Sequence, residues 1–502
     1  MNEKVQPIQQ IVEIRKEKLK KILEKGINPY PNHFKYTSDI LELINQFKNI
    51  SIGEVVEEKS VITKGRIILR REMGKSIFCT IQDFTGKIQI YLRKDVLKEK
   101  FEFFVELIDI GDIIGVEGNI FKTKTGELTI NVTDFVLLCK SLRPLPEKWH
   151  GLKDHETRYR QRYLDIITNL NVKEIFIKRS KIINTIRKIL NEKGFLEVET
   201  PIIQHLPGGA VARPFKTYHN ALGEEFYLRI APELYLKMLI VGGMEKIYEL
   251  GKSFRNEGID RYHNPEFTMV EIYQAYADYN DMMELTKEIF LKCCEAVDCK
   301  DKLEYCDGDN RYVIQINNFQ KFSLEDLFDR YVKIPLKDFI EDKISDETYE
   351  KLGIEIYESL PDGKKIKKPK KTLVDNVFEK YIQSNLIQPT FVVDYPKELS
   401  PLAKYSFYNK NMTERFEFYV ATKEIANAYS ELNDPIEQYE RFLQQTTEEE
   451  KMALNLEFIT ALEYGMPPTG GLGIGIDRLC MILTNTDSIR EVILFPLLRS
   501  IK

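Results

Sequence analysis

Hydrophobic and polar residues follow two different patterns in the first third of the chain. In residues 8–23 apolar positions recur every three or four residues opposite a basic face, which predicts a surface helix. Between Val61 and about Leu142 they alternate instead, in short runs separated by glycine-containing turns. Several short strands at this spacing predict a small closed β-domain such as an OB-fold barrel.

The pattern changes again beyond a proline-rich boundary, LRPLP at residues 142–146. After Ile175, helix-like periodicity in IFIKRSKIINTIRKILNEKG precedes extended segments such as KIYEL, FTMVEIY, TFVVDYP and RFEFYV. Strands of this type, close in sequence, favour an antiparallel sheet over a parallel one. The predicted class is α+β, with an N-terminal β-barrel (OB-fold) followed by a domain whose antiparallel sheet is flanked by helices.

These patterns divide the chain into four parts. We expect a helical extension at 1–50, the barrel at 51–145, a linker at 146–175 and the second domain at 176–502, with a helical insertion around 275–390. The lysine-rich segment DGKKIKKPKK, residues 362–371, is expected to be an exposed loop. A nucleic-acid contact at this loop is the alternative.

Composition is that of a water-soluble chain with several domains. The 502 residues are 43% hydrophobic and 30% charged, and they contain no apolar run long enough to span a bilayer. The N-terminal segment MNEKVQPIQQ lacks the apolar core of a signal peptide. Seven cysteines are an odd number that does not indicate a disulfide framework, so we expect a reducing cytoplasm and no membrane partner.

Cysteines and net charge limit the kinds of site to consider. Cys293, Cys294, Cys299 and Cys306 cluster, but their spacing lacks the paired CxxC of tetrahedral zinc, so ordinary thiols are favoured. The net charge of -5 excludes a surface that is basic all over. A local basic stripe for nucleic acid stays open.

The first candidate for chemistry is the stretch GKSFRNEGIDRYHNPEFTMVEIY. On its first arm, alternation puts Arg255 and Glu257 on one face. On the returning arm, Phe267, Glu271 and Tyr273 share a face. Such charges cost several kcal/mol each when buried without partners, so they must be paired or must meet a ligand.

A second candidate is RFEFYVATKEIANAYSELNDP, which begins at Arg415. Glu417 and Glu424 flank a turn between two strands and could bind Mg²⁺ and phosphate oxygens. Strict alternation takes Glu424 off the face of Asn427, so a bulge must turn it inward. Taken alone, this segment is better explained as a solvated hairpin.

The third candidate is GGLGIGIDRLCMIL, with Gly471, Gly473 and Gly475 in an apolar strand. A run of glycines in a strand usually marks close approach by a ligand or another backbone. Arg478 stands at the start of the following helix, where it could reach a nucleotide. The segment is neither a P-loop, which ends in GKS or GKT, nor a dinucleotide fingerprint.

Together the three segments resemble the class II aminoacyl-tRNA synthetases. GFLEVETPII, with Pro201, resembles motif 1 of that family, FRNEGIDRYHNPEF motif 2, and GLGIGIDRL motif 3, with Asp477 where most of the class carries Glu. RIAPELYLK, KEIANAYSELNDP and FPLLR, with the N-terminal barrel, are similar to lysyl-tRNA synthetases over essentially the whole chain. The resemblance implies ATP-dependent ligation of L-lysine to tRNA(Lys) through a lysyl-adenylate, with release of AMP and pyrophosphate.

For the nucleotide, the resemblance implies a site built from these charged segments. Arg255 bridges the α-phosphate and the amino-acid carboxylate, Phe267 and Arg478 sandwich adenine, and the two arginines are catalytic. Glu257 and Asn264 read the edge of adenine. The implied ATP set is Arg255, Glu257, His263, Asn264, Phe267, Glu424, Gly475, Asp477 and Arg478, and the implied Mg²⁺ ligands are Glu417 and Glu424.

For the amino acid, the resemblance implies a long apolar stem with acids at its ends. Glu271 and Glu431 take the ε-ammonium, and Glu233 takes the α-ammonium. The implied lysine set is Gly209, Glu233, Arg255, Glu271, Tyr273, Asn427, Tyr429 and Glu431. Paired glutamates favour lysine, because a site for aspartate or asparagine needs cationic or amide groups there.

In the barrel, Arg66, Phe78, Gln89 and Glu127 match the family's positions for reading anticodon uridines by stacking and edge hydrogen bonds. For Phe78 a core ring is the alternative. Pro201 implies a homodimer through motif 1. Two rival functions stay open: an aspartyl- or asparaginyl-tRNA synthetase, and an OB-fold nucleic-acid-binding protein with an inactive catalytic half.

Overall fold

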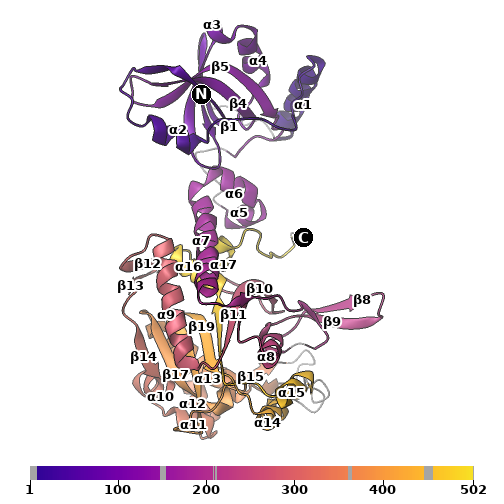
Figure 1. Cartoon of the computed structure of the whole chain (residues 1–502), viewed down its shortest axis with the longest axis vertical. Coiled ribbons are helices and arrows are strands. Elements are labelled where there is room, and N and C mark those ends of the chain that lie inside the picture. Colours follow the sequence, from indigo (N-terminus) through magenta and orange to yellow (C-terminus); the bar gives the residue numbers. More distant parts are fainter. Residues whose placement is uncertain are drawn as a thin grey trace. The chain divides into compact units, whose positions relative to one another are not determined.

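In the first of two units, Met1–Gly151, alternating strands close into a barrel (Figure 1). The strands are β1 (Val55–Met73), β2 (Ser76–Gln82), β3 (Lys87–Arg93), β4 (Ile113–Lys122) and β5 (Leu128–Cys139). Their order around the barrel is β1-β2-β3-β5-β4, antiparallel except for the β3–β5 pair. The predicted OB-fold is confirmed.

The computed structural model describes residues 8–146, 154–206, 208–209, 212–359, 365–445 and 456–500.

Side chains of alternate parity fill the barrel. Ile77, Cys79 and Ile81 of β2 point inward and are buried, whereas the residues between them lie on the outer face. Two helices connect β3 to β4, namely α3 (Lys94–Leu97) and α4 (Glu99–Leu107). Phe101 and Phe104 of α4 join the same hydrophobic core, so this connection closes one end of the barrel.

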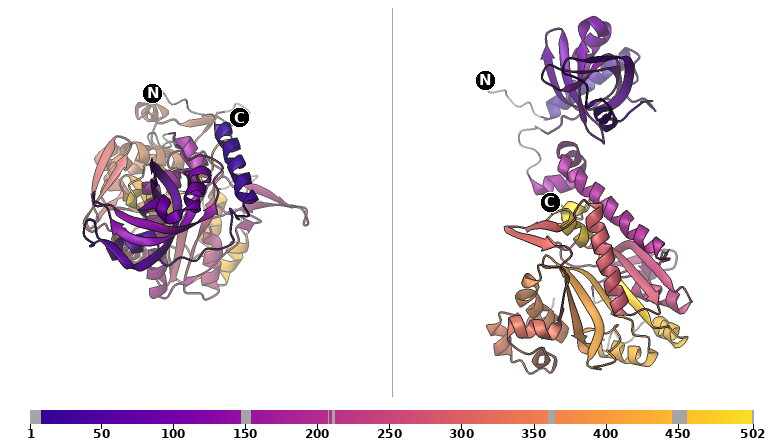
Figure 2. Two further views of the ribbon diagram at one scale, coloured as in Figure 1. Left: turned by 90° about the horizontal axis from the view of Figure 1, so that it is seen from above. Right: turned by 60° about the vertical axis from the view of Figure 1, so that its left-hand side comes forward.

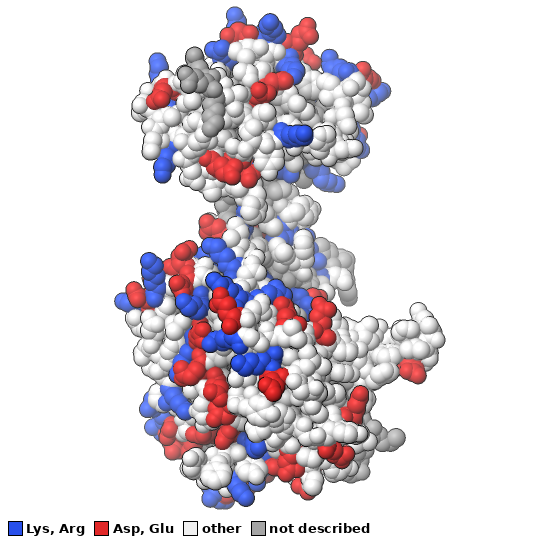
Figure 3. Space-filling model, in the orientation of Figure 1, with Lys and Arg blue, Asp and Glu red and all other residues white. Residues whose placement is uncertain are grey.

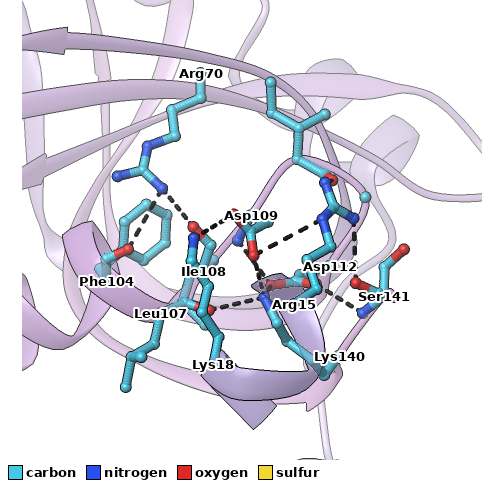
Figure 4. A network of polar contacts seen from close by, with 12 residues as sticks. Arg15, Lys18, Arg70, Phe104, Leu107, Ile108, Asp109, Asp112, Lys140 and Ser141 are labelled. Carbon is cyan, nitrogen blue, oxygen red and sulfur yellow. Dashed lines mark hydrogen bonds and ion pairs between the residues drawn. The ribbon is translucent and has the colours of Figure 1, made fainter. Parts of the chain in front are cut away.

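The predicted N-terminal helix is α1 (Ile8–Glu24), and it packs onto the barrel together with α2 (Ile40–Phe47). A polar network fastens it (Figure 4). The ammonium of Lys140 is wholly buried and lies 2.5 Å from Asp109 and 2.8 Å from Asp112. From α1, Lys18 pairs with Asp109 at 2.6 Å, and Arg15 donates to three backbone carbonyls of the barrel unit.

Replacing Lys140 with methionine tests how much this network contributes to the stability of the first unit. The change removes the cation that pairs with Asp112 while keeping side-chain length, and it leaves this fully buried carboxylate without a counterion among the described residues. We expect Lys140→Met to lower the free energy of unfolding of the first unit by about 3 kcal/mol. Urea denaturation followed by circular dichroism measures this, and an unchanged midpoint would contradict the assignment.

The second unit, Leu152–Lys502, is organised on an eight-stranded sheet of order β14-β17-β18-β19-β20-β11-β10-β6. The strands are β6 (Leu196–Glu197), β10 (Lys246–Phe254), β11 (Glu266–Ala275), β14 (Gln320–Ser323), β17 (Thr390–Pro396), β18 (Met412–Val420), β19 (Lys423–Ser430) and β20 (Thr469–Gly475). The predicted antiparallel pairing is confirmed from β17 to β10. Only the edge strands β14 and β6 pair in parallel.

Apolar helices cover one face of this sheet (Figure 2). They are α7 (Leu170–Glu192), α9 (Tyr279–Ala296) and α16 (Ile476–Leu483). Their buried side chains, Ile186 and Phe290 among them, form one core with Val270 and Ile474 of the sheet. Cys293 and Cys294 belong to this core, and burial raises the pKa of both thiols. Since one face is apolar, the polar residues of the same strands lie on the other.

Smaller elements surround the sheet. The remaining helices are α5 (His155–Arg160), α6 (Arg162–Thr168), α8 (Glu233–Val241), α10 (Leu324–Leu327), η1 (Phe328–Val332), α11 (Leu336–Ile340), α12 (Asp346–Lys351), α13 (Lys370–Tyr381), η2 (Gln383–Asn385), η3 (Lys397–Leu399), α14 (Pro435–Gln445), α15 (Leu456–Glu463) and α17 (Ile489–Val492). The remaining strands are β7 (Ile203–Gln204), β8 (Lys216–His219), β9 (Glu224–Leu228), β12 (Lys302–Asp307), β13 (Asn310–Gln315), β15 (Tyr357–Ser359) and β16 (Lys365–Lys367). Acidic and basic side chains alternate over the face shown in Figure 3. None of the helices in the described part of the chain could cross a membrane.

The lysine-rich segment differs from its expectation. Residues 361–364 lie outside the described part of the chain. Lys365–Lys367 are exposed but form strand β16, which pairs with β15. Lys371 lies in α13 and lines a cavity, where burial lowers the pKa of its ammonium. The expectation of an exposed loop is therefore wrong for Lys371, because helical periodicity turns this lysine inward.

Candidate active site

A cavity of about 1320 Å³ lies on the polar face of the sheet. Strands β11, β18, β19 and β20 form its floor, and α8, α13 and the chain after β17 form its walls. Every site residue expected in the second unit, Pro201 apart, lines it. These residues are Gly209, Glu233, Arg255, Glu257, His263, Asn264, Phe267, Glu271, Tyr273, Glu417, Glu424, Asn427, Tyr429, Glu431, Gly475, Asp477 and Arg478.

Arg255 stands at the end of the β10–β11 hairpin with its guanidinium free. The charge lies 5.1 Å from the centroid of the Phe267 ring, and the buried Nε has no hydrogen-bond partner. No carboxylate of the described residues forms an ion pair with it. Burial lowers the pKa of Arg255, although Glu257 and Glu424 oppose that shift. A half-buried arginine without an ion-pair partner is a preformed receptor for an anion.

Arg478 is held at the opposite side by a chain of contacts. One guanidinium nitrogen lies 3.4 Å from Glu424 Oε2, and another lies 3.2 Å from His263 Nε2. His263 Nδ1 in turn lies 2.8 Å from Asp260. Arg261 anchors the same loop by donating to the Asp487 carbonyl at 2.7 Å. Asp260 and Arg261, to which the sequence assigned no role, therefore position the loop.

Asp477 lines the cavity but directs its carboxylate away from it. One oxygen lies 2.6 Å from Arg179 of α7, and the other accepts the Thr268 backbone N–H at 2.7 Å. Asp477 thus ties α16 to β11. Asn264 is also engaged, since its Nδ2 donates to the Glu266 carbonyl at 2.6 Å.

Glu417 and Glu424 face each other across a register shift between β18 and β19, so that Glu424 turns inward as alternation required. Arg415 contacts one oxygen of Glu417 at 2.5 Å, and Tyr395 and Tyr419 donate to the other. Burial, and next the charge of Glu417, raises the pKa of Glu424.

A pair of partly exposed carboxylates that line the same cavity fits a divalent cation with oxygen ligands. The described residues contain no cluster of three or more acidic, histidine or cysteine side chains that could hold a metal alone. A Mg²⁺ ion would therefore arrive with phosphate oxygens. Each carboxylate offers it one incompletely occupied oxygen.

Three buried glutamates, Glu233, Glu271 and Glu431, line the other end of the cavity. Tyr273 donates to Oε2 of Glu271 at 2.7 Å, and Tyr429 donates to Oε1 of Glu233 at 2.9 Å. The second oxygen of each, and Oε1 of Glu431, has no hydrogen-bond donor among the described residues. Burial, and next the charge of Glu233, raises the pKa of Glu271 to about 7. Three free carboxylate oxygens at one end of a cavity form a site for ammonium groups.

Lys237 is a further charged residue here, and the sequence reading missed it. Its ammonium is wholly buried, lies 2.6 Å from Glu233 and pairs with Glu431. Burial alone would lower the pKa of Lys237, but these two carboxylates raise it. The signal was present, because Lys237 follows Glu233 at i,i+4, a spacing that brings two side chains together on a helix such as α8. Arg415, Tyr395 and Tyr419 were missed as well.

The glycines of β20 make room for these carboxylates. A Cβ on Gly471 would lie 1.9 Å from Glu431 Oε1 and 2.8 Å from the Tyr273 ring. A Cβ on Gly473 would lie 3.6 Å from Glu271, which is ordinary contact. Gly471 is thus required for the position of Glu431.

Of the expected barrel residues, Arg66, Phe78 and Gln89 occupy outward-facing positions of their strands. Phe78 and Gln89 stand on neighbouring strands, and the Phe78 ring stacks on Tyr91 with centroids 4.4 Å apart. Arg66 is paired with Gln82 on the adjoining strand and donates to the Gly111 carbonyl at 2.7 Å. Glu127 is exposed in the turn before β5. The half-buried Phe78 is not a core ring, and Tyr91 extends its aromatic surface.

Comparison with known proteins agrees with this geometry. Residues 154–499 match the family described as tRNA synthetases class II (D, K and N), and residues 61–138 match the OB-fold nucleic acid binding domain. The lysine–tRNA ligase of Pelotomaculum thermopropionicum is 49% identical over 98% of this chain and 95% of its own length. That of Carboxydothermus hydrogenoformans is 48% identical over 98% and 99%, and that of Aquifex aeolicus 54% over 88% and 73%.

The chain therefore belongs to the class II tRNA synthetases, with the OB-fold domain of their aspartate, lysine and asparagine group. Within that class it is a member of the lysine–tRNA ligase family.

Gly471→Ala tests the role of the β20 glycines. The added Cβ must displace the Glu431 carboxylate, so we expect the affinity for lysine to fall by at least about tenfold, which is roughly 1.4 kcal/mol. Affinity for ATP should change little. Gly473→Ala is the matched control on the same strand and should lose less. Titration calorimetry measures both, and equal losses in the two variants would contradict the assignment.

Proposed function

We propose that the chain activates L-lysine with ATP as an enzyme-bound lysyl-adenylate and transfers the lysyl group to tRNA(Lys). The observation that carries this proposal is the polarity of one cavity. A half-buried arginine without an ion-pair partner among the described residues lies in it, and three buried carboxylates with free oxygens lie at its end. That arrangement complements an amino acid with one carboxylate and two ammonium groups.

The first step is an in-line attack of the lysine carboxylate on the α-phosphate of ATP. Such a step needs positioning and charge stabilisation more than covalent chemistry. Arg255 binds both the carboxylate and the α-phosphate as a bidentate donor. Phe267 and Arg478 hold adenine between them, and Glu257 and Asn264 read its polar edge.

The outer phosphates meet the remaining charged groups. His263, oriented by Asp260, contacts them. Glu417 and Glu424 would hold Mg²⁺ against the phosphate oxygens, and the ion would reduce the negative charge that repels the incoming carboxylate. Arg415, Tyr395 and Tyr419 keep Glu417 in place for this role. Gly475 keeps the end of β20 open beside the nucleotide, and Asp477 secures the helix that carries Arg478.

Lysine is selected by the acidic end of the cavity. Glu271 and Glu431 bind the ε-ammonium, and Tyr273, Asn427 and Tyr429 line the aliphatic stem. Glu233 and the backbone at Gly209 bind the α-ammonium, since a Cβ on Gly209 would lie only 3.0 Å from Glu233 Cβ. Aspartate or asparagine would leave these buried carboxylates without counterions, which is costly.

The outer face of the barrel is our proposed site for the anticodon. Phe78 offers a ring for base stacking, extended by Tyr91, and Arg66, Gln89 and Glu127 offer polar groups for base edges.

We further propose a homodimer in a reducing cytoplasm. The segment around Pro201 contains the exposed edge strand β6 and exposed apolar residues, among them Leu196, Ile202 and Ile203. An exposed sheet edge beside apolar side chains favours pairing with a second copy. All seven cysteines are free thiols, which suits a reducing compartment.

Exchange of pyrophosphate into ATP, measured with each of the twenty amino acids, tests the function. We expect exchange with lysine alone, because only lysine neutralises both ends of the cavity. Exchange with aspartate or asparagine would support the rival synthetases. No exchange with any amino acid would support a barrel protein with an inactive catalytic half.

The pH dependence of lysine binding tests the carboxylate cluster. Glu271 must be ionised to bind an ammonium, so affinity is present above its pKa of about 7 and is lost as pH falls through it. Between about pH 6 and pH 8 the affinity for lysine should rise roughly tenfold. Calorimetry in two buffers of different ionisation enthalpy should also detect proton release on binding near pH 7. In Glu271→Gln both the pH dependence of lysine affinity and the proton release should be smaller. A wild-type affinity for lysine that does not change over this pH range would refute the assignment.

A further inference from the structure

Lys237 lies behind the wall of the cavity rather than in it. It stands one turn after Glu233 on α8, and its side chain is fully buried. It is absent from the residues that line the cavity, whereas both of its anionic partners belong to them. Its ammonium lies 2.6 Å from Oε1 of Glu233 and pairs with Oε2 of Glu431.

Among the described residues, the ammonium of Lys237 has no carboxylate partner other than Glu233 and Glu431. The ammonium lies 5.6 Å from the centroid of the Tyr429 ring and 5.9 Å from that of Phe458 in α15. Behind it is an apolar cluster that includes Leu236 and Leu462. A cation in such a place is stabilised by its two carboxylates and, more weakly, by the ring faces.

Each contact of Lys237 occupies one oxygen of a glutamate and leaves the other free. Glu233 has Oε2 available near Gly209, and Glu431 has Oε1 available above Gly471. A carboxylate with one oxygen anchored cannot rotate, so the free oxygen keeps its direction into the cavity. The contact also sets the charge of the wall. When all three glutamates are ionised, they carry two net negative charges together with Lys237, and the substrate lysine has two ammonium groups.

We propose that Lys237 is a positioning residue that determines the preference for lysine, because it anchors Glu233 and Glu431 and sets the charge of the cavity wall to match two ammonium groups. This inference rests on the proposed lysine site. The alternative is that Lys237 merely stabilises the fold, as Lys140 does in the barrel unit.

Lys237→Met separates these two roles, with Lys140→Met as the matched control. Each change replaces a wholly buried lysine between two carboxylates by a neutral chain of similar length. In Lys237→Met we expect the KM for lysine in pyrophosphate exchange to rise about 30-fold, while the KM for ATP and kcat change less than about threefold. Lys140→Met should lose stability and keep the KM for lysine. Equal losses in lysine KM, ATP KM and kcat of Lys237→Met would overturn the proposal.

Norleucine tests specificity directly, because it matches lysine in length and lacks the ε-ammonium. We compare the inhibition constant of norleucine, divided by the KM for lysine, between the two proteins. This ratio should fall about tenfold in Lys237→Met, mainly because lysine binds more weakly. A ratio that is unchanged or higher would overturn the proposal.

A double-mutant cycle keeps the test valid if Lys237→Met folds poorly. Lys237→Met combined with Glu431→Gln removes both members of the buried pair, which restores charge balance. The double variant should lose no more lysine affinity than the worse single variant. Multiplicative losses would show that Lys237 acts independently of Glu431 and would refute the inference. The failure of this inference can be told apart from failure of the proposed function. If the wild-type protein catalyses lysine-dependent pyrophosphate exchange and Glu431→Gln lowers its affinity for lysine, the proposed function stands. If in that case neither Lys237 variant behaves as stated, only the Lys237 inference fails.

Discussion

Negative charge buried on one face of a sheet is the constraint on which the second unit depends. Glu271, Glu417 and Glu424 rise from β11, β18 and β19 of that sheet, Glu431 follows β19 directly, and all four line one cavity. Unpaired, each would cost several kcal/mol. Lys237 and Arg415 offset part of this charge from within the protein. The remainder persists as raised carboxyl pKa values and is the driving force for cationic ligands.

Other features of the fold follow from placing those charges. The register shift between β18 and β19 turns Glu424 onto the face that Glu417 occupies. Gly471 lets the Glu431 carboxylate lie directly against β20. Asp477 uses both carboxylate oxygens to lock α16 against β11 and α7, which holds Arg478 at the edge of the cavity. Apolar packing of α7, α9 and α16 on the opposite face provides the rigid support.

Periodicity was sufficient for the main architecture, because strands and helices with one buried face must alternate their apolar residues at fixed periods. The barrel, the antiparallel sheet and the clustering of Arg255, Phe267 and Glu271 all follow from such patterns. The boundaries of some elements, and the direction in which their side chains point, did not follow from such patterns. Lys371 was assigned to an exposed loop, yet it lines the cavity from α13. A local count of lysines carries no information about which face of a helix packs against a distant strand.

The sequence by itself determined the class of fold and the family, and it predicted most of the residues that line the cavity, since each is written in local spacing and in residue type. Tertiary structure alone decided how the charges are shared. Lys237 lies next to Glu431 only because α8 packs against β11 and because Glu431, directly after β19, bonds to Thr469 at the start of β20. Asp477 turns from the cavity only because Arg179 of α7 reaches it. Electrostatic partners are chosen by distance in space, and a separation of about 200 residues along the chain hides them from any local pattern.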